Sequence, residues 1–336
     1  MPIKSFITRL INPANPRKYV RSYFSEGTVP CEKCGHAISM DGLAGLSFTR
    51  CPKCNYKNFV PLKVGDFLLC IPIGAGGMAS AYKAYHRETG DKVYAVKILM
   101  EEHIQNESAI ASFLGEAEIH KQIPAHPHIV NYIDSGQQDG RYFYAMEFVE
   151  GMRLLTRLES KGRFEELEAL RILTQVLSAL QHIYDQGYLY RDLSAGNVIV
   201  NPKGEAVLID FGLTLPIEEA LELEPTKFID GTVEFIPPER LFRTGEDQAS
   251  LIYSLGMLAF YMLRGEPLIK ASSLVGAAKK HVAKLRVSFT SAMLPECSRE
   301  VVDIVGRMIR TRHEDRYQTF TEAFDVLSAL LEKLEG

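Results

Sequence analysis

The chain has 336 residues, of which 46% are hydrophobic and 24% are charged, and its formal net charge at pH 7 is −4. This length and apolar content are enough for a large core, which excludes a disordered polypeptide. The small negative charge excludes a general attraction to nucleic acids or anionic membranes, so any such binding requires a local basic patch.

The first 25 residues are the one basic stretch of the chain. Their charged side chains are those of Lys4, Arg9, Arg17, Lys18 and Arg21. Such a segment can bind a membrane surface or a partner. Pro13 and Pro16 interrupt it, however, and we favour a tethered segment that packs loosely on its own protein. We find no secretory signal, and the longest apolar run, residues 251–263, is too short for a membrane span and predicts a buried helix. We therefore expect a cytoplasmic protein.

Four of the six cysteines form two closely spaced pairs, Cys31 with Cys34 and Cys51 with Cys54. Disulfides are not expected in the reducing cytosol. Two such pairs can hold one ion in a closed tetrahedral site, which suits structural Zn²⁺, and segment 29–62 resembles a zinc ribbon. A redox dithiol pair or four unrelated cysteines are the alternatives. A segment this short cannot fold by hydrophobic burial alone, so we expect the metal to hold it together.

The pattern changes after residue 66, where short β-branched and aromatic runs broken at glycines predict an antiparallel sheet. Helical periodicity appears at 107–123, more strands follow to about residue 150, and the chain beyond is mostly helical. The prediction is an α+β chain with a strand-rich small half and a helix-rich large half.

The two halves contain several motifs that suggest a chemical role. The glycine-rich stretch IGAGGMASAY begins at Ile73, and the strand VYAVK after it ends at Lys97. Backbone amides of such a loop can bind nucleotide phosphates, and a nearby lysine adds a positive charge. Further along lie YRDLSAGN at 190–197, DFG at 210–212 and PPER at 237–240.

These motifs, in this order, resemble those of the eukaryotic-like protein kinases, and the glycine-rich stretch resembles the bacterial serine/threonine branch. The resemblance covers residues 66–334 and implies a bilobal kinase fold, with a small lobe at 66–150 and a large lobe at 151–334. Residues 1–28 and the ribbon at 29–62 precede it. The implied activity is transfer of the γ-phosphate of ATP to serine or threonine hydroxyls of protein substrates, with Mg²⁺ as cofactor and autophosphorylation as a possible reaction.

The resemblance also implies the role of each site residue. Asp192 resembles the base that accepts the proton of the substrate hydroxyl, Asn197 and Asp210 resemble the Mg²⁺ ligands, and Lys97 resembles the phosphate-binding lysine. The other expected nucleotide contacts are Ile73, Gly74, Gly76, Gly77, Ala81, Ala95, Met146, Glu147 and Phe148.

Two ion pairs are implied as well. Glu116 is favoured over Glu118 as the helix partner of Lys97, because Phe113, one turn before Glu116, faces the core. Glu239 of PPER and Arg316 resemble a buried pair that braces the large lobe.

Some positions depart from the family pattern. Ser194 stands where serine/threonine kinases usually place a lysine, and losing that charge at a transferring phosphoryl group costs about 3 kcal/mol. Leu251 stands where relatives usually have an aspartate that bonds the backbone of the catalytic loop. Asp247 lies about one helical turn earlier, but we do not favour it as a substitute. Thr232, in contrast, resembles the threonine that serine/threonine kinases place beside the catalytic aspartate.

Regulation is predicted only in outline. Arg191 precedes the catalytic aspartate, and such kinases commonly need an anion on the segment 210–239 to pair with this arginine. The possible phosphate acceptors in that segment are Thr214, Thr226 and Thr232. The glutamates that could replace a phosphate are Glu218, Glu219, Glu222 and Glu224.

Two other functions stay open beside the active kinase. One is a pseudokinase or weakly active nucleotide-binding scaffold that docks partners through the zinc ribbon. The other is nucleic-acid binding by the ribbon, which its thin basic patch disfavours. The expected partners are therefore ATP, a protein substrate and a possible protein partner of the ribbon.

Overall fold

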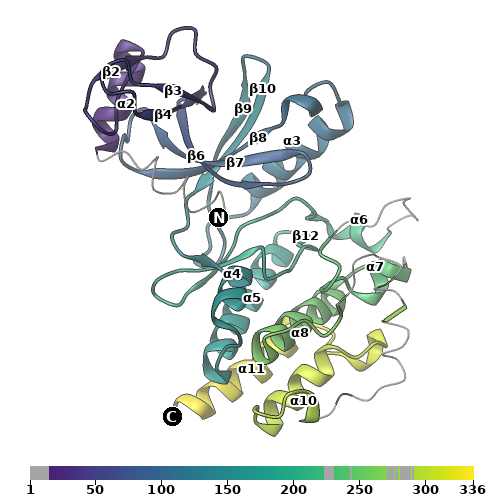
Figure 1. Ribbon diagram of the computed structural model, residues 1–336. Helices are drawn as coiled ribbons and strands as arrows, with labels where there is room; N and C mark the ends of the chain where they lie inside the picture. The colour runs from purple at the N-terminus through teal and green to yellow at the C-terminus, as the bar shows by residue number, and fades with distance from the viewer. Residues whose placement is uncertain are drawn as a thin grey trace. The chain divides into compact units, whose positions relative to one another are not determined.

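The computed structural model describes residues 15–222, 231–242, 244–270, 276, 279–280, 289 and 291–336. The chain divides into two compact units (Figure 1). The first comprises residues 1–117 and 131–148, and the second comprises residues 118–130 and 149–336. The division after residue 148 lies close to the point where the sequence predicts a change from strands to helices.

One six-stranded antiparallel sheet forms the core of the first unit, in the order β5-β6-β7-β8-β10-β9. Its strands are β5 (Leu62–Val64), β6 (Phe67–Ala75), β7 (Ala79–His86), β8 (Val93–Leu99), β9 (Tyr132–Gln138) and β10 (Arg141–Glu147). On β8, Val96 and Ile98 are buried, and Lys97 points to the opposite face because successive strand residues alternate. The predicted antiparallel meander is confirmed.

Two hairpins form the cysteine-rich segment before this sheet. They pair β1 (Thr28–Pro30) with β2 (Ala37–Ser39), and β3 (Ser47–Arg50) with β4 (Lys57–Val60). Each cysteine pair lies in the turn of one hairpin. Gly35 and Asn55 follow the pairs with φ values of 68° and 59°, the left-handed conformation that such turns need.

The segment before the hairpins is a helix, α2 (Pro16–Glu26), rather than a loosely packed tether. Pro16 occupies its first turn, where a missing amide costs nothing, and the side chain of Asn15 caps the amide of Lys18 at 3.0 Å. Tyr19 and Val20 are buried. The expected loose packing is therefore wrong for residues 16–26, whereas Pro13 lies outside the described residues.

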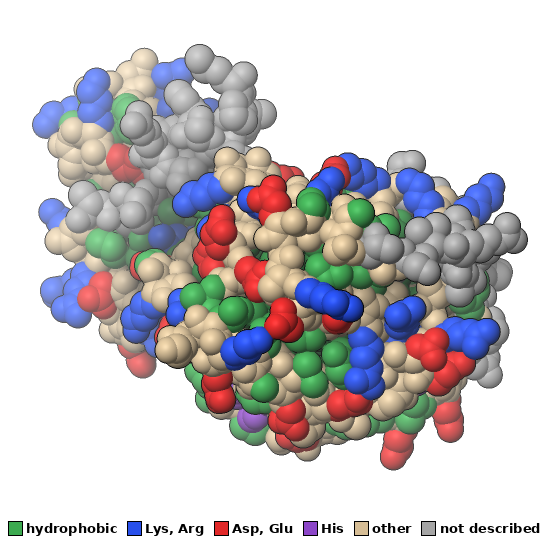
Figure 2. All heavy atoms as spheres, turned by 90° about the horizontal axis from the view of Figure 1, so that it is seen from below, with side chains coloured by type: hydrophobic (Ala, Val, Ile, Leu, Met, Phe, Trp, Pro, Cys, Tyr) green, Lys and Arg blue, Asp and Glu red, His purple; other side chains and the backbone are tan. Residues whose placement is uncertain are grey.

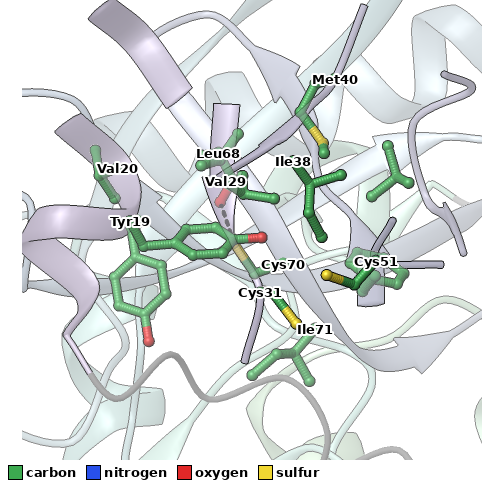
Figure 3. Packing of buried hydrophobic residues seen from close by; sticks show 13 residues of the cluster. Tyr19, Val20, Val29, Cys31, Ile38, Met40, Cys51, Leu68, Cys70 and Ile71 are labelled. Carbon is green, nitrogen blue, oxygen red and sulfur yellow. Dashed lines mark hydrogen bonds between the residues drawn. The ribbon is translucent and has the colours of Figure 1, made fainter. Parts of the chain in front are cut away.

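A single hydrophobic cluster joins α2, the hairpins and the sheet (Figure 3). Tyr19 of α2 and Cys31 and Cys51 of the hairpins belong to the same cluster as Leu68 and Cys70 of β6. The cysteine-rich segment is thus packed into the first unit, and its core is continuous with that of the sheet.

The helix α3 (Glu107–Gln122) begins in the first unit and ends in the second. The side chain of Asn106 accepts a hydrogen bond from the amide of Ala109 at 3.2 Å and so caps the first turn. Phe113 and Ala117 are buried, one turn apart on the same face.

The second unit is mainly helical. Its helices are α4 (Leu154–Lys161), α5 (Glu166–Asp185), α6 (Ile217–Leu221), α7 (Pro238–Phe242), α8 (Gln248–Arg264), α10 (Arg299–Met308) and α11 (Phe320–Glu335), with short 3₁₀ turns η2 (Ser291–Met293) and η3 (His313–Asp315). Its strands are β11 (Met152–Arg153), β12 (Tyr188–Leu189), β13 (Val198–Val200), β14 (Ala206–Leu208) and β15 (Leu215–Pro216). They form one three-stranded sheet, β11-β13-β14, and the pair β12-β15.

The apolar run at 251–263 lies within α8, which is buried along almost its whole length and contacts α5, α10 and α11. A helix that is apolar all round belongs in a core, so the predicted buried helix is confirmed. No helix within the described part of the chain has both the length and the hydropathy that a bilayer crossing requires. On the face shown in Figure 2, basic and acidic side chains are interspersed, which agrees with the small net charge.

Candidate active site

The first unit contains a partly buried lysine–glutamate pair. Nζ of Lys97 on β8 lies 2.5 Å from Oε1 of Glu116 on α3, and the two side chains are only 16% and 11% exposed. The ammonium of Lys97 also lies over the ring of Tyr144, 5.9 Å from its centroid. Glu118 is exposed and bonds Gln122 instead. The structure therefore pairs Lys97 with Glu116, as the sequence favoured.

The glycine-rich stretch forms the end of the β6–β7 hairpin, beside this pair. The amide of Gly76 donates to the carbonyl of Ala79 at 2.8 Å and closes the tip, while Ala81 lies directly opposite Lys97 in the β7–β8 ladder. Gly77 has open space where a side chain would be, so its backbone is accessible. Gly74, which pairs with Ala81, and Ile73 belong to the part of β6 that is exposed.

The segment expected to contact adenine lies at the end of β10. Met146 pairs with Ala95 across the β8–β10 ladder. The amide of Glu147 donates to the carbonyl of Asn131 at 2.9 Å, and its carboxylate accepts from the same residue's side chain at 2.8 Å. Phe148 follows, with Nζ of Lys83 4.7 Å from the centroid of its ring. The sheet thus gathers the sequence-predicted residues of the first unit along neighbouring strands.

In the second unit, Asp192 and Asn197 form one compact group. Nδ2 of Asn197 donates to the carbonyl of Asp192 at 3.0 Å and to its Oδ2 at 2.8 Å. Burial and the charge of Asp210 raise the pKa of Asp192, whereas Asn197, Arg240 and the backbone amide of Thr232 act against that shift. The side-chain nitrogen of Asn197 faces Asp192, so the side-chain oxygen of Asn197 faces away from that carboxylate. The carboxylate of Asp210 and the side-chain oxygen of Asn197 are oxygen donors of the kind that Mg²⁺ prefers.

Phe211, the second residue of DFG, is held between two other rings. Its ring stacks on that of His120 at 4.2 Å and 12°, and meets that of Tyr190 edge-on at 5.7 Å. His120 lies one turn after Glu116 on α3, and its Nε2 is 2.6 Å from the carbonyl oxygen of Val130. This packing joins residues from three separate parts of the chain, so the sequence did not predict it.

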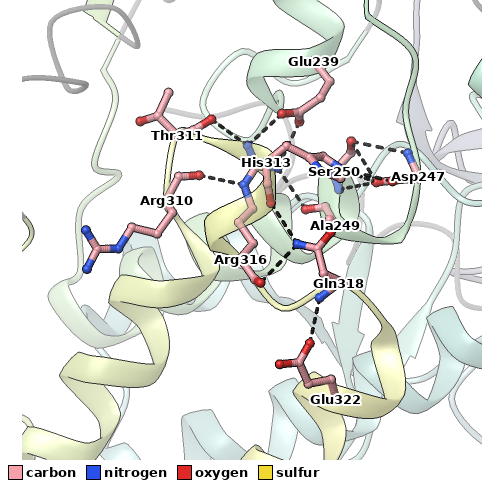
Figure 4. Close-up of polar contacts among 10 residues, drawn as sticks. All are labelled: Glu239, Asp247, Ala249, Ser250, Arg310, Thr311, His313, Arg316, Gln318 and Glu322. Atoms are coloured by element: carbon pink, nitrogen blue, oxygen red, sulfur yellow. Dashed lines mark hydrogen bonds and ion pairs between the residues drawn. The ribbon is translucent and has the colours of Figure 1, made fainter.

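The pair of Glu239 with Arg316 is present and buried (Figure 4). Nη1 and Nη2 of Arg316 donate to the two carboxylate oxygens of Glu239 at 3.0 and 2.8 Å. The same guanidinium donates to the carbonyls of Ala249, Arg310 and Thr311. This network satisfies the buried charge and ties α7, α8 and the segment before α11 together.

The four cysteines of the hairpins converge on one point. Their Sγ atoms all lie within 4.8 Å of one another, and the distances from Cys31 to Cys54 and from Cys34 to Cys51 are 3.6 and 3.7 Å. A tetrahedral ion with sulfur ligands about 2.3 Å away needs sulfur atoms about 3.8 Å apart, so the cluster fits such an ion. The sulfurs are too far apart for disulfides. Despite burial, backbone amides of Cys34 and Lys33 lower the pKa of Cys31, which favours the thiolate.

Comparison with known proteins agrees with this geometry. Residues 70–326 match the family model described as the protein kinase domain. The chain belongs to the protein kinase family. It is 30% identical over 254 residues to the "Probable serine/threonine-protein kinase PknB" of Lactococcus lactis, and 29% identical over 255 residues to the serine/threonine-protein kinase PrkC of Bacillus subtilis. These alignments cover 74% and 76% of this chain but only 40% and 39% of the relatives, so the chain spans about two fifths of their length.

One departure of this kinase domain from its family is resolved as expected. Asp247 does not replace the aspartate missing at Leu251: its carboxylate caps α8 at the amide of Ser250 and lies 2.8 Å from Nε2 of His313 (Figure 4). Leu251 itself is buried and apolar. The backbone of Arg191 is instead held by Arg240, whose Nη2 donates to its carbonyl at 2.6 Å.

The side chain of Arg191 also has a partner that the sequence analysis did not consider. Its Nη2 lies 2.6 Å from Oε1 of Glu246, a residue outside the segment 210–239. Of the possible phosphate acceptors, Thr214 is buried and its hydroxyl donates to the carbonyl of Tyr190 at 3.3 Å. Thr226 and Glu224 lie outside the described residues. Arg240 is the last residue of PPER, but only Glu239 of that motif was expected to have a role, and Glu246 lies outside the motifs of the sequence.

Proposed function

We propose that this kinase domain transfers the γ-phosphate of MgATP to serine or threonine hydroxyls of a protein substrate. The observation that carries the proposal is the group formed by Asp192, Asn197 and Asp210. Asp192 is close enough to Asn197 to be oriented by it, and its neighbour Asp210 supplies a second carboxylate. In this role Asp192 accepts the proton of the attacking hydroxyl, while Asn197 and Asp210 hold Mg²⁺, which neutralises charge on the phosphates.

The residues of the first unit bind the nucleotide in this proposal. Lys97, fixed by Glu116, places its ammonium at the phosphates, and the backbone of Gly74, Gly76 and Gly77 covers them. The adenine contacts fall on Ile73, Ala81, Ala95, Met146, Glu147 and Phe148. The amide of Glu147 already bonds Asn131, so the carbonyl of Glu147 is the group that meets the adenine edge.

The position of Thr232 supports a serine or threonine acceptor over tyrosine. Its backbone amide bonds the carboxylate of Asp192, which places the residue beside the proposed base, as the family resemblance implies for serine/threonine kinases. The related chains from Lactococcus and Bacillus are named serine/threonine kinases. We therefore extend that specificity to this domain.

The cysteine cluster is proposed to hold one structural Zn²⁺. Four thiols at tetrahedral spacing favour zinc over metals that prefer oxygen ligands. The four cysteines fill all four coordination positions and leave none for water, so the ion stabilises the fold and takes no part in phosphate transfer. A protein partner that docks on this ribbon stays part of the proposal, as does a cytoplasmic location.

Transfer of labelled γ-phosphate to a generic basic protein tests the proposed activity. We expect wild-type protein to label serine or threonine, and Asp192→Asn to label at least a hundredfold more slowly. A scaffold without activity predicts another result: no incorporation by either protein, with ATP still raising the melting temperature. Equal incorporation by both proteins would also refute Asp192 as the base.

A further inference from the structure

The backbone that carries Asp192 is unusual at the residue before it. Arg191 has a φ of 59°, and the amide of Asp192 donates to the carbonyl of Tyr190 at 2.8 Å. Together these features describe a tight three-residue turn with a left-handed centre, which is uncommon for a residue with a side chain. Such a conformation persists only when the surrounding structure holds it. The turn determines where the carboxylate of Asp192 points.

Two buried side chains hold this turn from both sides. Nε and Nη2 of Arg191 donate to Oε1 of Glu246 at 3.0 and 2.6 Å, so the arginine side chain is fixed at two atoms. Nη2 of Arg240 donates to the carbonyl oxygen of Arg191 at 2.6 Å, which fixes its backbone. The side chain and the carbonyl of the strained residue are therefore both restrained.

Glu246 connects these two restraints. Its side chain is only 1% exposed, and both of its carboxylate oxygens accept from Arg240 at distances of 2.6 to 3.0 Å. Burial alone would raise the pKa of Glu246, but the charges and hydrogen bonds of Arg240 and Arg191 outweigh burial and lower it, so the carboxylate is ionised. The carboxylate of Glu246 therefore binds the guanidinium groups of both Arg191 and Arg240.

The backbone around Glu246 and Arg240 is anchored as well. The amide of Glu246 donates to the carbonyl of Ala220 at 2.9 Å, and Asp247, the next residue, caps α8. Arg240 lies on the short helix α7, and Gly231 packs so closely that a side chain there would come within 2.7 Å of Nη1 of Arg240. The pair is held by three separate elements of the second unit.

We propose that Glu246 is a positioning residue for Asp192: through Arg191 and Arg240 it holds the turn that aims the proposed base. This inference rests on the proposed function of Asp192. It also explains how the domain tolerates an apolar residue at Leu251, because the acceptor and donor that restrain the loop come from Glu246 and Arg240. The ion pair of Arg191 with Glu246 requires no phosphate.

The test replaces Glu246 with glutamine in the full chain, which keeps the size but removes the charge. We expect Glu246→Gln to lower kcat at least tenfold while the KM for ATP stays within twofold, because the proposed nucleotide contacts of Lys97 and the glycine-rich stretch do not involve it. The matched control is Glu332→Gln, which neutralises an exposed carboxylate on α11 and should change neither constant.

Hydrogen exchange of the peptide covering residues 188–198 gives a second readout that needs no phosphate transfer. We expect the amides of this peptide to exchange about tenfold faster in Glu246→Gln than in wild type or in Glu332→Gln. If the wild type transfers no phosphate, the proposed function fails, while this readout still decides whether Glu246 holds the turn. Unchanged kcat with unchanged exchange would overturn the inference.

A second variant covers the case in which Glu246→Gln does not fold. Arg240→Lys keeps the buried positive charge, but a single ammonium cannot reproduce the fork that bonds Glu246 and the carbonyl of Arg191 together. We expect the same fall in kcat and the same faster exchange at 188–198. Wild-type values for both in a folded Arg240→Lys protein would contradict the positioning role.

Discussion

At the residue scale, the loop at 190–197 contains the proposed base and one proposed metal ligand but lacks a cation that serine/threonine kinases usually place there. Asp192 and Asn197 lie in contact, but Ser194, two residues after the base, is a buried neutral side chain. A positive charge at a transferring phosphoryl group stabilises the transition state more than the ground state. A slow kinase is the expected consequence.

Ser194→Lys tests this expectation. We predict that the variant raises kcat about tenfold, because its ammonium adds a charge where phosphate transfer develops one. Ser194→Met is the matched control, since methionine has a similar length without the charge, and it should not raise the rate. Steady-state phosphotransfer measures both. No gain, or a fall, in Ser194→Lys with normal folding would show that another cation already fills this place.

At the element scale, the segment between α3 and β9 packs on α5 through histidines. The ring of His126 stacks on that of His182 at 4.8 Å and lies 5.6 Å from that of His128. Burial first, and then the charges of His182 and His128, lower the pKa of His126 to about 4. The ring of His126 is therefore uncharged in the folded protein at neutral pH.

This shift predicts a dependence of stability on pH. Between about pH 6.5 and 4, the unfolded chain binds a proton at His126 that the folded chain does not. The contribution of His126 to the free energy of unfolding is therefore fully present above pH 6.5 and falls as the pH drops through this window. His126→Gln should flatten the curve of melting temperature against pH there. Melting curves at several pH values measure the difference. A wild-type slope in the variant would assign the acid sensitivity to other groups.

Some contacts between elements could be predicted from sequence, and others could not. Asp192 and Asn197 lie in one short motif, and the family resemblance of that motif predicts that they act together. Arg191 and Glu246 are 55 positions apart, and nothing in the spacing relates them. The helix α2 was misjudged for a different reason: Pro16 was taken as an interruption, although it occupies the first turn, where proline is tolerated.

At the scale of the whole molecule, the ribbon is part of the kinase domain's own core. Cys31 and Cys51 belong to the same buried cluster as Leu68 and Cys70 of β6, the strand that leads into the glycine-rich stretch. The sequence predicts the four ligands from their spacing. It does not predict the shared core, because that depends on apolar residues scattered over α2, the two hairpins and the sheet.

Loss of the proposed Zn²⁺ should therefore affect more than the ribbon. We predict that Cys34→Ser abolishes binding of one Zn²⁺ per chain and lowers the melting temperature by several degrees, because a ligand of the closed site is removed. Cys297→Ser is the control, since Cys297 is half-buried and not part of the cluster. Metal analysis and thermal melting measure both effects. Full metal content in Cys34→Ser would contradict a four-cysteine site.

We propose that this domain is an active kinase whose base is Asp192. Rapid-quench measurement of phosphate transfer from pre-bound MgATP tests it most directly, because a single turnover separates chemistry from nucleotide binding. We predict that Asp192→Asn slows the transfer step at least a hundredfold while the Kd for ATP stays within threefold. Equal single-turnover rates in wild type and Asp192→Asn, at equal ATP occupancy, would contradict the claim.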